Sequence, residues 1–371
     1  MEATLTHVHS LMYTILAFMP THYQRDSLEA MLGLFLEAQG KPLPHYSKTK
    51  SESALSRFLN HYNWSTRQII RHLRRTVIEL ILSECRRGRK PFLQVIIDLT
   101  TLEKTGKFKA FNHLITIYNH KRGLHLVVLY LVVGQWRIPW NFRVWRGSCS
   151  TTPAQLALKM VCRLPKQLTR QFQVKILADS AFGTKEFIHG IRKLKYHAIL
   201  GIGCNRKLVD GRSVKDLCHR GQQLKLVGLD FPVTISWYYF KTDKGVFIKR
   251  YVISTIPLKA ATISWWGKRR WQIEGWFKTA KHRFGLDKFG QSTLLGIYRW
   301  LILSVTAYLL AHWTYLAQYY PHTLDWGQAA FLALSTFFPI LLLSLLLLDI
   351  ERLRPLAFSH GIDITISRCK I

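Results

Sequence analysis

Acidic residues and closely spaced cysteines are both scarce in this chain. Only 21 of its 371 residues are Asp or Glu, against 53 Lys and Arg, which gives a formal net charge of +32. A chain this basic repels itself unless a polyanion or an anionic membrane surface neutralises it. The six cysteines form no CxxC pair, and the nearest approach to a metal knuckle is Cys204 with Cys218 and His219. Their spacing argues against zinc fingers and disulfide scaffolds, and it favours a reducing compartment.

Long uncharged stretches are almost absent as well. Residues 329–348 carry no charge and are about as long as a membrane-spanning helix. Pro339 lies in the middle of this single segment, so two short buried helices are the better interpretation, and we expect no membrane partner. The N-terminus has no basic residues ahead of its apolar ones, which argues against a secretory signal. With 48% hydrophobic and 13% aromatic residues the chain is not generally disordered, and its length predicts two to three domains.

Residues 1–90 have helical periodicity and become increasingly basic. Segments 51–60 and 65–82 are predicted to be short helices, with Ser65 or Thr66 as the N-cap of the second. This pair, with its Arg-rich second helix, resembles a helix-turn-helix. A solvated charged face is the alternative, but the charge excess favours contact with DNA phosphates. The basic residues concerned are Arg67, Arg71, Arg74, Arg75, Arg86, Arg87, Arg89 and Lys90.

The pattern changes from helical to β after residue 90. Apolar runs rich in β-branched residues predict strands, and a Thr-Pro pair at 152–153 opens a helix. Three strands with a hairpin, then helix, strand, helix and strand, is the element order of an RNase H-like core, an α/β fold. The predicted strands are 91–98, 113–119, 124–133, 173–179 and 197–203, and the predicted helices are 152–162 and 185–194.

A second β-rich stretch follows this core. Residues 231–240 and 246–255 alternate apolar and polar side chains on either side of a turn, and helical periodicity returns at 264. We therefore expect a helical N-terminal DNA-binding domain, an RNase H-like core with a β-rich insertion, and a helical C-terminus. The expected boundaries are 1–90, 91–204 for the first part of the core, 205–263 for the insertion, 264–320 for the rest of the core, and 321–371.

Two of the scarce acids follow predicted strands. Asp98 comes at the end of QVIID, and Asp179 at the end of VKILAD. Carboxylates at the carboxyl ends of adjacent parallel strands lie side by side, and such a pair repels itself unless a divalent cation such as Mg²⁺ lies between its members. The alternative is that both residues cap the turns that follow them.

A third acid lies on a predicted helix. In RWQIEGWFKTAK, Arg270, Glu274 and Lys281 are spaced by four and seven residues, so they share one helix face. An ordinary surface ladder of ion pairs explains these three charges, but it does not explain the two strand-end aspartates.

These motifs together resemble the DDE transposases of bacterial insertion sequences. The chain looks like the branch with a Tyr-x2-Arg-x3-Glu-x6-Lys motif and a β insertion before the catalytic Glu. Arg270, Glu274 and Lys281 match its last three positions, whereas the Tyr position falls on Gly267; Trp265 or Trp266 is the substitute aromatic. IDLTTLEKTGK, LADSAFGTKEF and GQSTLLGIYRWLILSVTAYLLAHW resemble the family's first-Asp region, its second-Asp region and the helix after the Glu helix.

The resemblance implies an activity, its cofactor and its site residues. Asp98, Asp179 and Glu274 would hold two Mg²⁺ ions, for which Mn²⁺ can substitute, and would cleave and transfer DNA strands in line at phosphorus. Arg270 and Lys281 would hold phosphates near the cleaved end. Tyr251, in KRYVISTIP, would stack on a flipped base, with core packing as its alternative.

The resemblance also implies partners and a location. The implied partners are double-stranded DNA at inverted-repeat ends, target DNA, and a second copy of the chain in a homodimer. The implied location is the bacterial cytoplasm, at the nucleoid. Three alternatives stay open: another RNase H-like nuclease such as a junction resolvase, an inactive descendant that only binds DNA, and a basic membrane protein built on 329–348.

Overall fold

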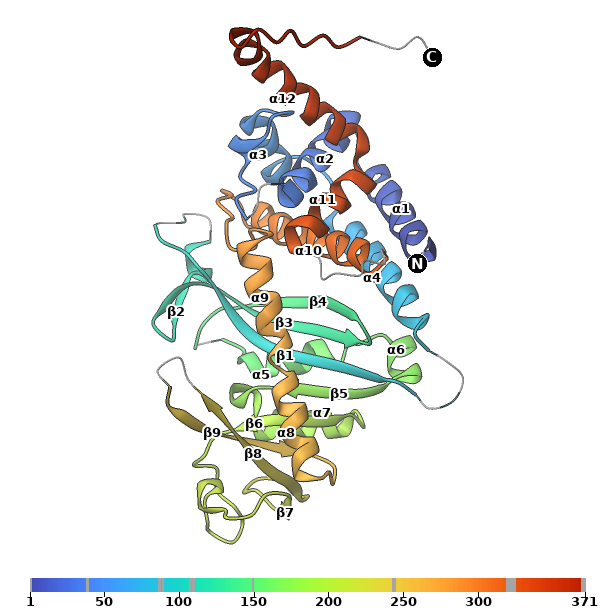
Figure 1. The fold of residues 1–371 in the computed structure, drawn as a ribbon. Helices are drawn as coiled ribbons and strands as arrows, with labels where there is room; N and C mark the ends of the chain where they lie inside the picture. The colour runs from blue at the N-terminus through green and yellow to red at the C-terminus, as the bar shows by residue number, and fades with distance from the viewer. Residues whose placement is uncertain are drawn as a thin grey trace. The chain divides into compact units, whose positions relative to one another are not determined.

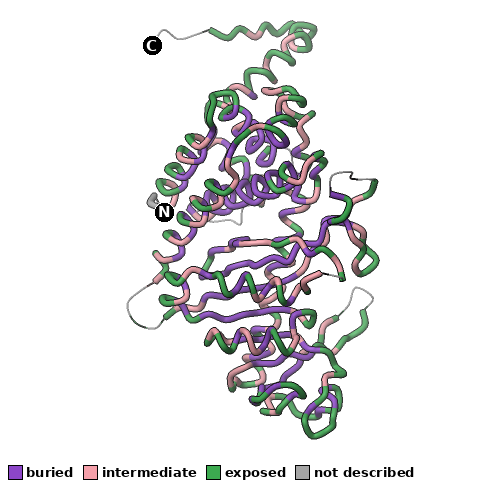
Figure 2. Tube along the Cα trace, turned by 180° about the vertical axis from the view of Figure 1, so that it is seen from behind, coloured by how far each residue is buried: buried purple, intermediate pink, exposed green. Residues whose placement is uncertain are grey.

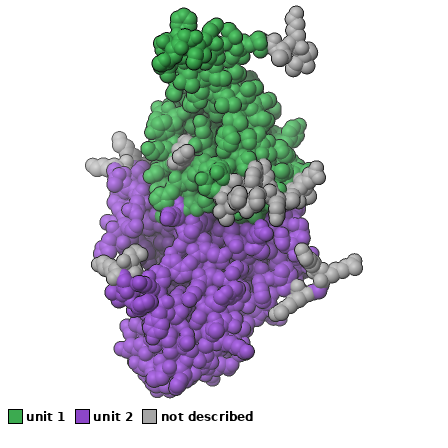
Figure 3. All heavy atoms as spheres, viewed as in Figure 1, with its two compact units in different colours: residues 1–73, 279–371 green, residues 74–278 purple. Residues whose placement is uncertain are grey.

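The computed structural model describes residues 2–37, 40–85, 88, 90–106, 108, 111–148, 150–241, 245–317 and 325–367. These residues form two compact units, coloured in Figure 3: Met1–Leu73 with Thr279–Ile371, and Arg74–Lys278. Two helices, α4 (Thr66–Leu82) and α9 (Gln272–His282), run across the division between them.

The second unit is built on a mixed β-sheet (Figure 1). Its central strands run in the order β4-β3-β1-β5-β6. β3 is antiparallel to both of its neighbours β1 and β4, whereas β5 is parallel to β1 and β6 is parallel to β5. This is the strand order of an RNase H-like core, and the predicted fold class is confirmed. The bounds are β1 Phe92–Glu103, β2 Thr116–Tyr118, β3 Lys121–Val133, β4 Trp136–Trp145, β5 Gln173–Ala178 and β6 His197–Ile202.

One of these strands is not predicted by the sequence pattern. β4 alternates apolar with polar residues, but it contains Pro139, and a proline inside such a run argues against a strand because it cannot donate to the sheet. The structure tolerates Pro139 because the register with β3 shifts between Leu129 and Tyr130, so that Trp140 is an extra residue in a bulge. The segment predicted as a strand at 113–119 forms only the short β2 after a 3₁₀ turn, and β4 is the third long strand of the sheet.

The β-rich insertion extends this same sheet. β9 (Phe247–Ser254) pairs antiparallel with β6, β8 (Val233–Lys241) with β9, and β7 (Gln222–Leu224) with β8. Both predicted strands are present, and the sheet continues past β6 without a break. Their burial does not alternate as predicted: residues 233–237 and 251–254 are buried throughout, because these halves are covered on both faces, and the halves nearer the turn are exposed or half-buried.

Helices pack beside the sheet of this unit (Figure 1). The predicted start of α5 (Pro153–Val161) is confirmed: Thr152 and Gln155 form a capping box, with Pro153 in the first turn. The central strands are buried along almost their whole length, as Figure 2 shows in purple. The other helices are α6 (Lys166–Gln171), α7 (Lys185–Lys193) and α8 (Ala260–Arg269).

The first unit is helical, as predicted for both ends of the chain. Its central helix α10 is long and apolar enough to cross a membrane, but 83% of its most apolar window is buried inside the protein, as in the core of a helical bundle. Residues 329–348 form α11 and the first part of α12, and the chain bends by 108° at the break before Pro339, so two helices are present as predicted. The prediction that both are short and buried is wrong for α12, which is 21 residues long and has Leu345 as its one buried residue among those described. The bounds are α1 Glu2–Ala17, α2 His22–Glu37, α3 Glu52–Asn60, α10 Leu294–Ala317, α11 Trp326–Phe337 and α12 Pro339–Ser359.

A buried arginine fixes the connection between α3 and α4. Arg299 of α10 is 1% exposed and donates hydrogen bonds to the carbonyl oxygens of four residues. These hydrogen bonds satisfy carbonyl groups at the end of α3 and in the loop that follows, which otherwise have no helical partner. The guanidinium also lies over the Trp64 ring, 4.1 Å from its centroid. The four carbonyl groups belong to Phe58, Leu59, Tyr62 and Trp64.

Candidate active site

The two strand aspartates lie level with each other in the sheet. β1 and β5 pair in parallel up to Ile97 and Ala178, so Asp98 and Asp179 are the next residues on adjacent strands. The sequence predicts that Asp98 ends its strand. In the structure β1 instead continues to Glu103, because it pairs with β3 beyond the point where its pairing with β5 ends. The parallel partner does end there, and the side-by-side placement expected of the pair is present.

An arginine from the helical segment joins Asp98 to Glu274. Arg270 follows α8, and its Nη1 lies 2.6 Å from Oδ2 of Asp98 while its Nη2 lies 2.9 Å from Oε1 of Glu274. The side chains of Arg270 and Asp98 are 14% and 12% exposed, whereas that of Glu274 is 38% exposed. Trp271 supports the arginine, since the Arg270 guanidinium lies 5.0 Å from the Trp271 ring centroid. Arg270 thus forms two ion pairs, one with Glu274 four residues later and one with Asp98 in the sheet.

Burial and crowding determine the electrostatics of this carboxylate cluster, which we define as Asp98, Asp179 and Glu274. Burial raises the pKa of Asp98 to about 7; the Arg270 charge opposes this shift, and the charges of Asp179 and Glu274 add to it. Burial also raises the pKa of Asp179, against Arg270 and the N–H groups of Ala181 and Phe182. One guanidinium therefore compensates three carboxylates only in part.

The cluster offers the donor chemistry that a divalent cation needs. Its oxygen ligands suit Mg²⁺ or Mn²⁺, and a cation held between carboxylates would offset the repulsion among them. Across the described ranges, no three His, Cys, Asp or Glu side chains are already arranged as ligands of one ion. Arg270 instead bridges two of the three carboxylates, so it must give way for a cation to be held by the whole cluster.

Lys281 and the position of the missing tyrosine lie elsewhere on the same helical segment. Lys281 is in the last turn of α9, about 10 Å along the axis from Glu274 in its first turn. At Gly267 a Cβ atom would lie 3.0 Å from Val252 and 3.2 Å from Tyr238, so β8 and β9 leave no space for a ring. Of the two candidate aromatics, Trp266 is buried and Trp265 is 51% exposed.

The arginines of α4 divide into two groups. Arg67, Arg71 and Arg75 are exposed at intervals of four residues, so they lie along one face of the helix. Arg74 is half-buried and donates to the carbonyl oxygen of Trp140 at 3.3 Å, with its guanidinium 5.1 Å from that ring centroid. The candidates Arg86, Arg87 and Arg89 lie outside the described residues.

Tyr251, the candidate for base stacking, is in the core of the sheet. It is 7% exposed, its ring lies 5.9 Å from that of Trp237, and its hydroxyl donates to the carbonyl of Lys215 at 3.5 Å. This placement agrees with the core-packing alternative. Exposed aromatic rings of the insertion are found instead at Tyr239 and Phe247.

Two residues near the cluster escape sequence reasoning. Arg250 of β9 lowers the pKa of Asp179 by its charge, and Trp271 stacks on Phe240 with ring centroids 4.8 Å apart. Arg250 is one of many basic residues in the insertion, and only the pairing of β9 with β6 brings it toward Asp179. Spacing along the chain carries no signal for either residue.

The fold places the chain among α/β proteins with an RNase H-like transposase core. The sequence profile described as the transposase DDE domain matches residues 90–310, more than half of the chain, and the chain belongs to this family. It is therefore an enzyme of DNA transposition. A comparison with curated proteins finds no match. A solved piggyBac transposase synaptic complex with hairpin DNA, determined by cryo-EM, is similar with a TM-score of 0.46 and 12% identity over 93% of this chain and 78% of that chain.

Proposed function

We propose that this protein is the transposase of a bacterial insertion sequence, of the branch with a Tyr-Arg-Glu-Lys motif. It binds the inverted-repeat ends of its element as a homodimer and moves the element by metal-dependent strand cleavage and strand transfer. The observation that carries the proposal is the placement of buried Asp98 and half-buried Asp179 on adjacent parallel strands, with Arg270 joining Asp98 to Glu274, in a chain of the transposase DDE family. Its place of action is the bacterial cytoplasm, at the nucleoid.

The carboxylate cluster supplies ligands in this proposal. Asp98, Asp179 and Glu274 would hold two Mg²⁺ ions, or Mn²⁺, which activate a water or 3′-hydroxyl nucleophile and stabilise the leaving 3′-oxygen. Asp179 is held in place by the Ala181 N–H, which donates to its Oδ1 at 3.0 Å, and Asp98 by the Leu99 N–H at 2.8 Å. These backbone hydrogen bonds fix the two carboxylates before any ligand arrives.

Arg270 would contact DNA in this proposal. Its fork of N–H groups can donate to two phosphate oxygens of the cleaved end in bidentate geometry, while the carboxylate cluster would hold the cations. Lys281 provides a second positive charge toward the same end. The exposed arginines of α4 contact the backbone of the end duplex, and their contribution depends strongly on salt. Tyr251 reaches a flipped base only if β9 and its neighbours rearrange.

The proposal is tested with the full chain and labelled duplexes that carry the DNA flanking its gene. We expect Mg²⁺-dependent cleavage at the boundary of an inverted repeat, followed by joining of the 3′ end to a target duplex. A synthetic four-way junction is the competing substrate. Cleavage of the junction with no action on the flanking ends would point to a resolvase. Binding without any cleavage in Mg²⁺ or Mn²⁺ would point to an inactive descendant.

A further inference from the structure

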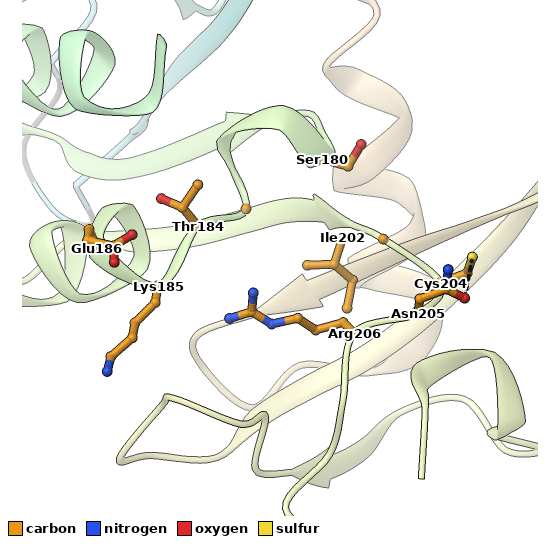
Figure 4. Close-up of a pocket in the computed structure, with 10 residues that line it drawn as sticks. Ser180, Thr184, Lys185, Glu186, Ile202, Cys204, Asn205 and Arg206 are labelled. Atoms are coloured by element: carbon orange, nitrogen blue, oxygen red, sulfur yellow. Dashed lines mark hydrogen bonds between the residues drawn. The ribbon is translucent and has the colours of Figure 1, made fainter. Parts of the chain in front are cut away.

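A pocket lies next to Asp179 of the carboxylate cluster, at the carboxyl ends of β5 and β6. Its volume is about 510 Å³, which is within the range of ligand-binding pockets. Ser180, which lines it, directly follows Asp179, so the pocket begins one residue from the candidate active site. The lining residues are Ser180, Gly183, Thr184, Lys185, Glu186, Ile202, Gly203, Cys204, Asn205 and Arg206 (Figure 4).

The walls of this pocket are fixed by backbone packing. A Cβ atom on Gly183 would lie 2.7 Å from the carbonyl oxygen of Gly201, and one on Gly201 would lie 2.9 Å from the amide nitrogen of Ser180. The two glycines therefore let the turn after β5 pack directly on β6. On the other side, the Arg206 N–H donates to the Gly203 carbonyl at 3.1 Å. The pocket is thus a feature of the backbone rather than a gap between flexible side chains.

The charges around the pocket favour an anion. Arg206 extends across it toward the first turn of α7, where Lys185 also lies (Figure 4). Among the described residues, neither Arg206 nor Lys185 forms an ion pair with a carboxylate, although Glu186 is in the lining. Thr184 caps the Phe187 N–H of α7, while the N–H groups of Lys185 and Glu186 have no helical acceptor and add positive potential at this end of the helix. Two basic side chains at a helix N-terminus outweigh the single acid.

The shape and lining favour a sugar–phosphate backbone over a base. None of the ten lining residues is aromatic, and Ile202 is the single large apolar one. A base or an apolar ligand would find no stacking surface, whereas phosphate oxygens find N–H and ammonium donors. We propose that this pocket binds the phosphate backbone of the DNA strand adjacent to the cleaved phosphodiester, with Arg206 and Lys185 as its contacts. The inference rests on the proposed function, since it takes the cluster as the place of cleavage.

Cys204 permits a test that does not depend on activity. It is exposed and lines the pocket, whereas Cys162, also exposed, ends α5 outside it. The full chain is alkylated with iodoacetamide with and without a duplex carrying the terminal inverted repeat. We expect DNA to abolish alkylation of Cys204 and to leave that of Cys162 unchanged. Equal alkylation of Cys204 under both conditions, at DNA concentrations that give a complete gel shift, would overturn the inference.

Gly203 permits a steric test that removes no charge. A Cβ atom there meets no atom within 4 Å, and the same holds for Gly290, outside the pocket. Gly203→Gln should fold like the wild type, but its side chain should fill the pocket and block the phosphate from its basic contacts. Arg206→Ala removes one of those contacts directly. Each variant should weaken binding of the DNA end about tenfold, since each loses charge-assisted hydrogen bonds. Gly290→Gln should bind and cleave normally. Wild-type behaviour of all three variants would overturn the inference, while a wild-type chain that neither binds nor cleaves would overturn the proposed function as well.

Discussion

Asp98 is buried close to the negative charges of Asp179 and Glu274. Its protonation should therefore change the free energy of unfolding with pH. Its pKa is about 7 in the folded chain, against 3.8 as the ordinary value. The folded state therefore binds more protons than the unfolded state between these values, and the free energy of unfolding falls as the pH rises from about 4 to 7. Asp98→Asn should flatten that decline in metal-free buffer, measured by thermal melts across this range. Asp363→Asn, at an exposed acid, should leave the pH profile unchanged.

Arg270 acts, in this structure, as the cation of the carboxylate cluster. Arg270→Ala leaves Asp98 buried beside two like charges and should cost about 3–5 kcal/mol of stability in EDTA at neutral pH. The same variant should gain more in melting temperature from Mn²⁺ than the wild type gains, because the competing guanidinium is gone. Arg269→Ala, which removes a hydrogen bond to Gln94 instead, is the matched control. An equal gain from Mn²⁺ in the wild type and in Arg270→Ala would show that Arg270 does not compete with the metal.

For single residues, sequence reasoning succeeds where the geometry is local. Strand positions predict that Asp98 and Asp179 are neighbours, and helical spacing predicts the pairing of Arg270 with Glu274. The second ion pair of Arg270, to Asp98, joins residues 172 positions apart. It cannot be predicted without knowing how the segment 270–274 packs on the sheet. For Tyr251 the sequence leaves base stacking and core packing both open, since an aromatic in a strand can face either side, and the structure buries its ring.

Substitutions in helix α4 should distinguish the arginines that contact DNA from the arginine that supports the fold. Replacing the exposed Arg67, Arg71 and Arg75 with Ala should reduce the slope of log affinity against log salt by up to roughly 0.9 per arginine that contacts a phosphate. The melting temperature should change little. Arg74→Ala should lower the melting temperature and leave the slope nearly unchanged, because its guanidinium packs on Trp140. An unchanged slope in the triple variant would mean that this face of α4 is only solvated.

The loop between α3 and α4 depends on one side chain of α10. Arg299→Met keeps much of the apolar volume but removes the arginine donor from four carbonyl groups. The Phe58 carbonyl keeps the Trp64 Nε1–H, and each of the others costs about 1–3 kcal/mol if it stays dry. We expect a large fall in melting temperature and loss of the salt-dependent DNA binding assigned to α4. Arg57→Met, at an exposed position of α3, should be nearly neutral. A stable Arg299→Met variant would show that the loop is held by other contacts.

Element boundaries mark the limit of what periodicity predicts. The helices of the first unit and strands β5, β6, β8 and β9 follow directly from their apolar patterns. β1 is longer than predicted because Thr100 to Glu103 continue to pair with β3 after β5 has ended. β4 is missed because Pro139 lies inside its alternating run, and only the bulge at Trp140 in the pairing with β3 lets the sheet accommodate that proline. Both errors arise from pairing between strands, which no single segment reveals.

At the scale of the whole chain, a strongly basic protein places three of its few acidic residues, the carboxylate cluster, together at its sheet. The net charge of +32 suits a DNA partner, and the carboxylate cluster is where a cation and a scissile phosphate would meet. The family profile covers the sheet, the insertion and most of α10. The helical unit contributes α1, α2 and the C-terminal helices beyond that profile.

The most direct measurement is single-turnover cleavage of a labelled inverted-repeat end in Mg²⁺ by Asp98→Asn, Asp179→Asn and Glu274→Gln, with gel-shift affinity measured in parallel. Loss of the cluster's ligands removes several kcal/mol of transition-state stabilisation, so we expect each variant to cleave at least about a thousandfold more slowly. End affinity should stay near that of the wild type, because it comes mainly from basic side chains. Asp230→Asn, at a largely exposed acid of the same unit, should cleave normally. Wild-type cleavage by any one of the three cluster variants would contradict the assignment of that residue to the active site.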